Sequence, residues 1–110
     1  VVNRIKNSDD FGLTIKKGKT ANSKCFTVHF VKNNLSYTRV GISASTKLGN
    51  AVIRSRVKRQ MREMCDSLID YNNNSLDIVI VIRSPFLENS FSDNKSLLSD
   101  LLNVQVGINK

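Results

Sequence analysis

Five cationic side chains fall within nine residues of this chain, at Arg54, Arg56, Lys58, Arg59 and Arg62. Four of the five are arginines, whose planar guanidinium can donate two parallel hydrogen bonds to a phosphate. Residues 47–65 hold six cations, Lys47 included, against one acid, a net charge of +5. A solvated helix face usually mixes both signs, because like charges four residues apart repel one another. The spacing therefore predicts a surface that binds a polyanion.

The apolar residues of the same segment indicate which element holds these cations. They recur at spacings of four, four, three and four, at Ile53, Val57, Met61, Met64 and Leu68. At about 100° per residue they form one stripe along a helix over residues 51–68, which Asn50 is placed to cap. Lys58, Arg59 and Arg62 point away from this stripe, and Arg54 and Arg56 flank them. The pattern predicts an amphipathic helix with a core-facing side and a basic side.

The type of polyanion follows from the rest of the pattern. A helix that lies on a membrane surface would expose large apolar residues, whereas this apolar stripe suits a protein core. A helix-turn-helix DNA reader needs two adjacent helices, but the flanking segments have the alternation of strands. The remaining class is structured RNA, bound through its phosphates and shape, and no DNA partner is expected.

The composition is that of a small basic protein. The chain has 110 residues, 17 Lys and Arg against 9 Asp and Glu, and a formal charge of +8. This length suits one domain, so we expect a single RNA-binding domain over residues 1–110. No apolar run approaches the roughly 20 residues of a membrane-spanning helix. No signal-peptide pattern opens the chain, so we expect a cytoplasmic protein with no membrane partner.

Few groups in the chain suit catalysis. His29 is the only histidine, and the two cysteines, Cys25 and Cys65, lack the spacing of a zinc site, so we expect both to be buried apolar residues. The neighbours Asp9 and Asp10 point in different directions on a helix, so we expect them to stabilise its first turn rather than to bind a metal. We expect no catalytic residue and no protein-bound metal.

The hydrophobic pattern predicts six elements in the order α-β-β-α-β-α. They are a helix at 8–17, strands at 25–31 and 37–45, the helix at 51–68, a doubly buried strand at 76–82, and a helix at 96–104. In the final helix we expect four leucines to face inward, namely Leu97, Leu98, Leu101 and Leu102. A small central sheet with helices packed against it is an α+β sandwich.

Three segments of the chain resemble the bacterial ribonuclease P protein family. The segment "RVGISASTKLGNAVIRSRVKRQMRE" is similar to the family signature, in which a Lys-Lys-x-Gly-Asn-Ala-Val loop precedes an Arg-Asn-Arg-x-x-Lys-Arg core. "DDFGLTIKKGKTANSKCF" and "DIVIVIRSPF" are similar to its first helix and strand and to its last central strand, so the resemblance covers about residues 4–102. It implies a fold like the second domain of a small-subunit ribosomal protein, with a left-handed crossover through the Arg-rich helix.

Three residues depart from the family pattern. Ser55 stands where the family has Asn, which shortens the reach of a hydrogen-bonding side chain. Thr46 replaces the first Lys of the Lys-Lys pair and removes one charge. Ile15 replaces a second aromatic residue on the first helix, and so removes a stacking surface.

The resemblance also implies a mechanism. In the family an RNA subunit is the catalyst and uses bound Mg²⁺ to remove the 5′ leader from precursor tRNA, while the protein binds the catalytic RNA and the leader. Carried onto this chain, the contacts with the catalytic RNA fall on Lys47, Arg54, Ser55, Arg56, Lys58, Arg59 and Arg62. The contacts with the leader fall on a set that we call the leader cleft, namely Phe11, Ile15, Thr27, His29, Ser43 and Thr46.

Alternatives remain at two levels. Phe11 can pack in the core instead of stacking on a base, and His29 can be a surface residue of a half-covered sheet. The alternation of the strand at 25–31 predicts that Thr27 and His29 are exposed on the side opposite Phe26, Val28 and Phe30. For the whole chain, a ribosomal or RNA-chaperone protein that binds structured RNA without any processing reaction would share the basic helix.

Overall fold

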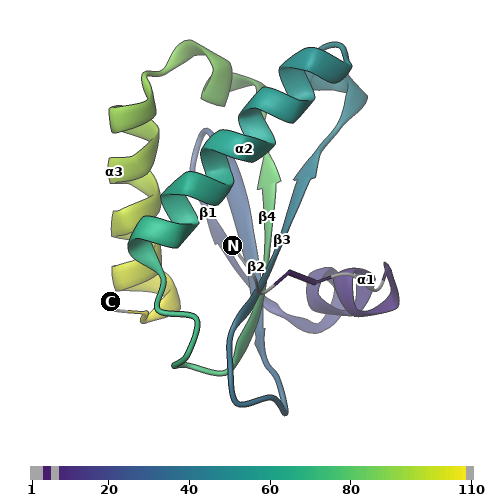
Figure 1. Ribbon diagram of the computed structural model, residues 1–110, viewed down its shortest axis with the longest axis vertical. Helices are drawn as coiled ribbons and strands as arrows, with labels where there is room; N and C mark the ends of the chain where they lie inside the picture. Colours follow the sequence, from purple (N-terminus) through teal and green to yellow (C-terminus); the bar gives the residue numbers. More distant parts are fainter. Residues whose placement is uncertain (1–3, 6–7, 109–110) are drawn as a thin grey trace.

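The computed structural model describes residues 4–5 and 8–108, and its centre is a four-stranded sheet (Figure 1). The strands lie in the order β1-β2-β4-β3. They are β1 (Lys19–Asn22), β2 (Phe26–Lys32), β3 (Arg39–Ala44) and β4 (Leu76–Ile82). β2 pairs antiparallel with both β1 and β4, whereas β3 and β4 are parallel. The parallel pair requires a crossover, and helix α2 (Ala51–Leu68) supplies it.

The crossover is left-handed. In Figure 1, α2 lies in front of the sheet, both parallel strands run upward, and β4 lies to the left of β3. Most parallel connections are right-handed, so the sequence pattern alone would favour a right-handed crossover. The left-handed crossover was implied only by the family resemblance. The α+β sandwich and the predicted order of its elements are both confirmed.

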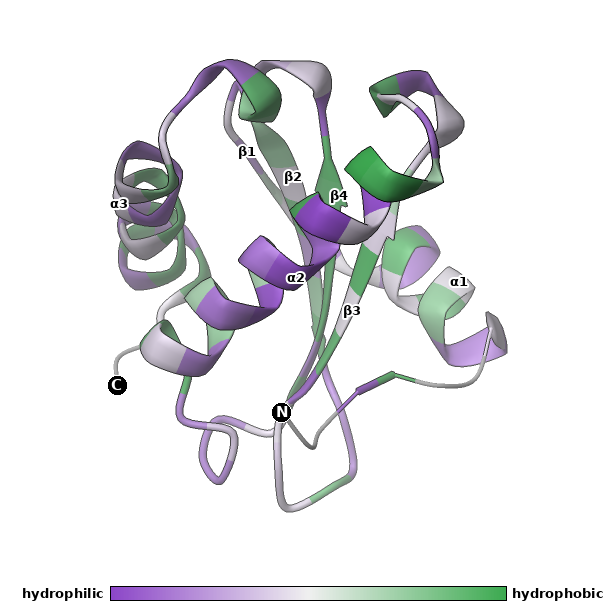
Figure 2. Ribbon diagram, turned by 45° about the horizontal axis from the view of Figure 1, so that its top comes forward, coloured by the Kyte–Doolittle hydropathy of each residue, from purple (hydrophilic) through white to green (hydrophobic). Residues whose placement is uncertain are grey.

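The core lies between the sheet and the two helices on one of its faces. Val57, Met61 and Met64 of α2 are buried against the strands, and they belong to the predicted apolar stripe. α3 (Phe91–Leu101), which continues into a π-helical turn at Leu102–Val106, covers the rest of this face. Figure 2 shows the resulting division of α2, whose outward surface is hydrophilic while the strands beneath are hydrophobic.

α1 (Ser8–Lys17) packs on the opposite face, against β2 and β4. Two acids occupy its first turn and two lysines its last, as the helix dipole favours. Ahead of it, residues 4–5 run beside β3, where the Ile5 amide donates to the Val40 carbonyl at 3.2 Å. Within the described residues, no helix combines the length and the apolarity needed to cross a bilayer.

Three details differ from the sequence-based expectations. The short edge strand β1 was not predicted, because four residues are too few for a periodic signal. The last helix begins at Phe91 rather than at residue 96, since Ser90 caps it by accepting from the Asp93 amide at 3.1 Å. Leu97 is 38% exposed, whereas the other three leucines of that helix are buried as expected.

Candidate RNA-binding surfaces

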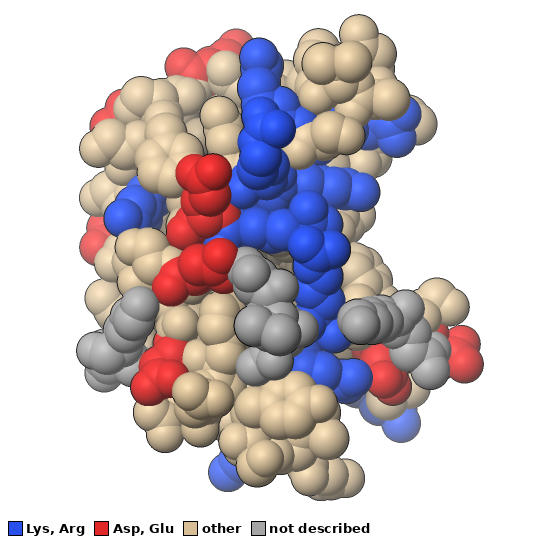
Figure 3. All heavy atoms as spheres, viewed as in Figure 1, with Lys and Arg blue, Asp and Glu red and all other residues tan. Residues whose placement is uncertain are grey.

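The outward side of α2 carries the predicted cations, and we call it the basic face. Arg56 and Arg59 are exposed, while Arg54, Lys58 and Arg62 are half-buried. Asn50 fixes the start of the helix by accepting a hydrogen bond from the Ile53 amide at 3.1 Å. Because the opposite side is locked into the core, the cations are presented on a rigid element. Figure 3 shows Lys and Arg gathered in a continuous band on this side of the molecule.

Acids do not neutralise the centre of this face. Among residues 4–5 and 8–108, no carboxylate forms an ion pair with Arg56 or Arg59. The Nε atom of Arg54 is buried and has no hydrogen-bond partner within the same described residues. Unneutralised guanidinium groups at a fixed spacing are suited to phosphate oxygens, which accept charged hydrogen bonds.

The loop before α2 extends the basic face. Lys47 and Thr46 are exposed in a short 3-10 helix, η1 (Thr46–Leu48), which directly follows β3. Ser55, also exposed, lies with Arg56 and Arg59 around a hollow on the outer surface of the first turns of α2. The structure thus places all seven residues predicted to contact the catalytic RNA on one helix and the loop that precedes it.

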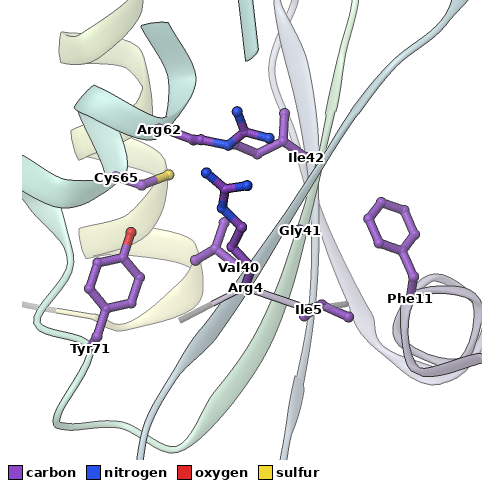
Figure 4. Close-up of a pocket in the computed structure, with 9 residues that line it drawn as sticks. All are labelled: Arg4, Ile5, Phe11, Val40, Gly41, Ile42, Arg62, Cys65 and Tyr71. Atoms are coloured by element: carbon purple, nitrogen blue, oxygen red, sulfur yellow. The ribbon is translucent and has the colours of Figure 1, made fainter. Parts of the chain in front are cut away.

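A second hollow, of about 300 Å³, lies at the edge strand β3, between the C-terminal half of α2, residues 4–5 and Phe11 of α1 (Figure 4). The guanidinium groups of Arg4 and Arg62 come from separate segments and both extend over it. Cys65 lines it from α2, and complete burial raises the pKa of its thiol to about 12, so Cys65 is a neutral core residue as predicted. Arg4 enlarges the cationic surface beyond the residues that the sequence analysis singled out.

The predicted leader cleft lies on the other face of the sheet, beside α1. The strand register places His29 and Gly41 in one row across the sheet and Thr27 and Ser43 in the next, on either side of β4. The side chains of His29, Thr27 and Ser43 point away from the core face, because alternate residues of a strand face opposite ways. Figure 4 shows Phe11 and Arg62 on opposite sides of β3, and both line the hollow at this edge strand, so the two candidate surfaces meet there. Thr46, predicted for the cleft, lies in the loop that extends the basic face.

Phe11 packs directly on the backbone of β3. A Cβ atom on Gly41 would lie 2.6 Å from the Cε2 atom of the Phe11 ring, so only glycine permits this approach. Phe11 is half-buried, which means that the ring packs on the sheet and still keeps part of its surface accessible. Ile15, one turn later on α1, is 39% exposed. The core-packing alternative for Phe11 is therefore met in part, and stacking on a base stays a prediction for the exposed part of the ring.

One expectation for the cleft was wrong. Thr27 is only 2% exposed, although the strand alternation predicted an exposed side chain. Its hydroxyl donates to Asn22 Oδ1 at 3.0 Å and accepts from Arg83 Nε at 2.9 Å. The two larger side chains cover it, since β1 and the end of β4 lie on either side of β2 at this level.

His29 lies two residues after Thr27 on β2, on the same face of the sheet, and is half-buried. Its Nδ1 atom lies 3.2 Å from the hydroxyl of Thr20 on β1. Burial, and then the positive charge of Arg83, lower the pKa of His29 below its ordinary value of 6.5. The imidazole is therefore neutral near pH 7 and can stack or hydrogen-bond without carrying charge.

These features match one known family. The family model for ribonuclease P matches residues 2–105. The chain belongs to the ribonuclease P protein family. Proteins of this family are subunits of a ribonucleoprotein endonuclease that matures the 5′ ends of tRNA, and the enzyme activity belongs to the complex.

Individual relatives cover almost the whole chain. The ribonuclease P protein component of Alkaliphilus metalliredigens is 36% identical over 100 residues, which are 91% of this chain and 90% of the relative. The RNase P protein of Staphylococcus aureus is 32% identical with a TM-score of 0.85, over 99% of this chain and all of that one. The RNase P protein of Thermotoga maritima gives 31% identity and a TM-score of 0.77, over 94% and 98% of the two chains.

Ribonuclease P as a whole is a metal-dependent ribonucleoprotein, so the fit of a metal to this subunit needs a test. Within residues 4–5 and 8–108, no group of three or more His, Cys, Asp and Glu side chains is arranged to hold an ion. Asp10 forms an ion pair with Arg39 at 3.3 Å instead. The described side chains therefore offer no cluster of three such ligands for a metal ion.

Four residues of these surfaces escaped the sequence analysis, namely Arg4, Arg39, Gly41 and Arg83. Arg4, Arg39 and Arg83 are isolated cations in the sequence, with no charged neighbour at helical spacing. Gly41 interrupts a strand, and a glycine within a strand often marks the close approach of another group. That signal was available, but it did not identify Phe11 as the group.

Proposed function

We propose that the chain binds the catalytic RNA of ribonuclease P through the basic face of α2 and holds the 5′ leader of precursor tRNA in the cleft between α1 and the sheet. In this proposal residues 1–110 act as one RNA-binding domain in the cytoplasm. The observation that supports it best is the division of α2. Its inner side is buried in the core, and its outer side carries cations, of which Arg56 and Arg59 are exposed and form no ion pair within the described residues.

The two surfaces can act at the same time because α2 and α1 pack on opposite faces of the sheet, although the surfaces meet at the hollow beside the edge strand β3. On one face, arginines and lysines replace counterions along the phosphates of the folded catalytic RNA. On the other, the Phe11 ring and the neutral imidazole of His29 offer flat surfaces to unpaired bases. Binding the leader through this face favours precursor over mature tRNA, since only the precursor has a leader.

Chemistry at the scissile phosphodiester belongs to the RNA in this proposal. Mg²⁺ would be bound mainly by the RNA subunit and the substrate, and would supply charge neutralisation and an activated water there. The contribution of this chain is to hold the leader in register with the site on the RNA, which acts through positioning. Asp9 and Asp10 take no part in bond cleavage.

Reconstitution tests the proposal directly. The protein is added to a bacterial ribonuclease P RNA at low Mg²⁺, and cleavage of precursor tRNA is measured. We expect strong stimulation of cleavage, and tighter binding of precursor than of mature tRNA to the complex. The protein without RNA should leave precursor intact with any divalent metal.

The same assay separates the alternative function. A ribosomal or RNA-chaperone protein would bind the RNA through the basic face but would neither stimulate cleavage nor favour the precursor. RNA-free cleavage that follows the protein through purification, and disappears when Asp9 or Asp10 is replaced, would instead indicate a nuclease acting alone.

A further inference from the structure

Arg39 joins α1 to the sheet through two acids. Its Nε and Nη2 atoms donate to the two carboxylate oxygens of Asp77 at 2.9 and 2.6 Å, and its Nη1 atom donates to Asp10 Oδ2 at 3.3 Å. Asp77 is on β4, Arg39 is its register partner on β3, and Asp10 is in the first turn of α1. Two strands and one helix are thus connected by a single guanidinium.

The sheet end of this connection is fixed. The side chain of Asp77 is only 9% exposed, and that of Arg39 is 18% exposed. Asp77 accepts a further hydrogen bond from Asn33 Nδ2 at 2.8 Å, so its charge is well compensated. The bidentate geometry leaves the guanidinium plane little freedom to turn. The third nitrogen of Arg39 is therefore presented toward α1 in a set direction.

At the helix end of this connection, α1 buries little of its own surface. α1 has ten residues, and a helix this short is marginal without tertiary contacts. Thr14 is its only buried residue, while Leu13 and Ile15 are 52% and 39% exposed. Phe11 follows Asp10 directly, so the ion pair acts beside the ring that packs on Gly41.

We propose that Arg39 and Asp10 are positioning residues for the leader: the chain of ion pairs from Asp77 through Arg39 to Asp10 holds α1 at the distance from the sheet that places Phe11 in the leader cleft. Neither residue needs to contact the leader. This inference rests on the proposed function, because it concerns how the proposed cleft is shaped. It predicts that α1 no longer holds the leader when the pair is broken, while the basic face keeps its hold on the catalytic RNA.

The test breaks the exposed half of the connection. Replacing Arg39 would leave the Asp77 charge buried without its partner, which would destabilise the fold. The Asp10 side chain is 43% exposed, so its removal leaves no buried charge without a partner. We would compare wild type, Asp10→Ala and the control Asp93→Ala, which removes an exposed acid from the first turn of α3. Each is assembled with catalytic RNA, and the ratio of affinities for precursor and mature tRNA is measured.

We expect Asp10→Ala to lower this ratio by about two- to five-fold, the range of a partly exposed ion pair. Its affinity for the catalytic RNA should change no more than that of Asp93→Ala, because both lose one negative charge. Asp10→Glu, which keeps the charge, should restore most of the ratio. An unchanged or increased ratio in a folded Asp10→Ala protein would overturn the inference.

A double-mutant cycle shows whether the ion pair acts through the ring. Once Phe11 is replaced by Ala, removal of the Asp10 carboxylate should lower the ratio little further. Independent, additive decreases would contradict a positioning role. The ratio of precursor to mature tRNA affinity in the wild type separates the two proposals. A wild-type complex with no preference for precursor contradicts the proposed function itself. A wild-type preference that Asp10→Ala retains in full contradicts only this inference.

Discussion

The basic face of α2 and the leader cleft differ in how many segments build them. The basic face is one helix with a short loop before it, so its residues are neighbours in sequence as well as in space. The cleft combines α1, β2, β3 and Thr46 of η1, and its strand residues are brought together by the pairing of β4 with both strands. A local surface can therefore be predicted from the spacing of residues, whereas a composite surface depends on the register of the sheet.

The two regions also differ in how firmly they are held. α2 buries four side chains in the core, while α1 buries only Thr14 and relies on Phe11 and the Arg39 ion pair. We expect the first surface to bind through charge on a rigid support, with a strong dependence on salt. We expect the second to bind through stacking on a helix that small changes can displace.

The largest expected effect is the removal of two cations from the basic face. Arg56→Ala with Arg59→Ala should weaken binding to the catalytic RNA by about 3–6 kcal/mol if each arginine makes a charged hydrogen bond to phosphate. The slope of log affinity against log salt should flatten by about 0.7–0.9 for each phosphate that an arginine no longer neutralises. Titrations at several salt concentrations measure both quantities.

The matched control for this prediction is Lys24→Ala with Lys95→Ala, which removes the same charge from residues outside α2 and the loop before it. The control should lose less affinity and keep more of the slope. Equal effects of the two double variants would mean that net charge, and not this face, determines RNA binding.

Phe11→Ala should weaken binding of leader-bearing precursor by about 1–3 kcal/mol, the value of stacking one base on an aromatic ring. Affinity for mature tRNA and for the catalytic RNA should stay nearly constant. Phe91→Ala is a suitable control, because Phe91 is 38% exposed and starts the helix on the other face. Circular dichroism must show native folding, since Phe11 also packs on Gly41.

A double variant of Phe11→Ala and His29→Ala extends this test. If it folds and still prefers precursor by the wild-type margin, the leader is not held by this face.

Ser55→Asn should strengthen binding to the catalytic RNA by about 0.5–1.5 kcal/mol, the net value of one hydrogen bond. Ser55 is exposed beside Arg56 and Arg59, so a longer amide has room to reach RNA. Ser67→Asn, at an exposed position in the last turn of α2, makes the same change away from the proposed RNA-binding residues. A gain shared by both variants, or absent from both, would show that residue 55 does not contact RNA.

The smallest expected effect is a pH dependence in the cleft. The pKa of His29 is lowered by burial and then by Arg83, so the unfolded chain binds its proton more readily than the folded protein. The folded state is therefore favoured above pH 6.5, the ordinary value, and this contribution is lost as the pH falls below it. Thermal melts at pH 7 and pH 5 should show a larger decrease for wild type than for His29→Gln. Equal decreases in melting temperature would mean that folding does not lower the pKa of His29.

Much of the fold could be predicted because most elements carry a strong local signal. The α2 helix, its Asn50 cap and the apolar run of β4 were predicted with the observed bounds, since each has a clear period or a capping residue. β1 and the start of α3 were missed, because one is too short for a period and the other begins at a serine cap within a polar stretch. The burial of Thr27 was missed because its cover comes from Asn22 and Arg83, which lie on other strands or beyond them.

The basic face needed nothing beyond the sequence, because 3.6 residues per turn convert the spacing of Arg56, Arg59 and their neighbours directly into a surface. The side of α2 that enters the core was equally determined, since burial of apolar area selects it. The meeting of Phe11 with Gly41, and of Arg39 with both Asp10 and Asp77, required the folded chain. Those contacts depend on strand register and on the hand of the crossover, and neither is encoded in the spacing of nearby residues.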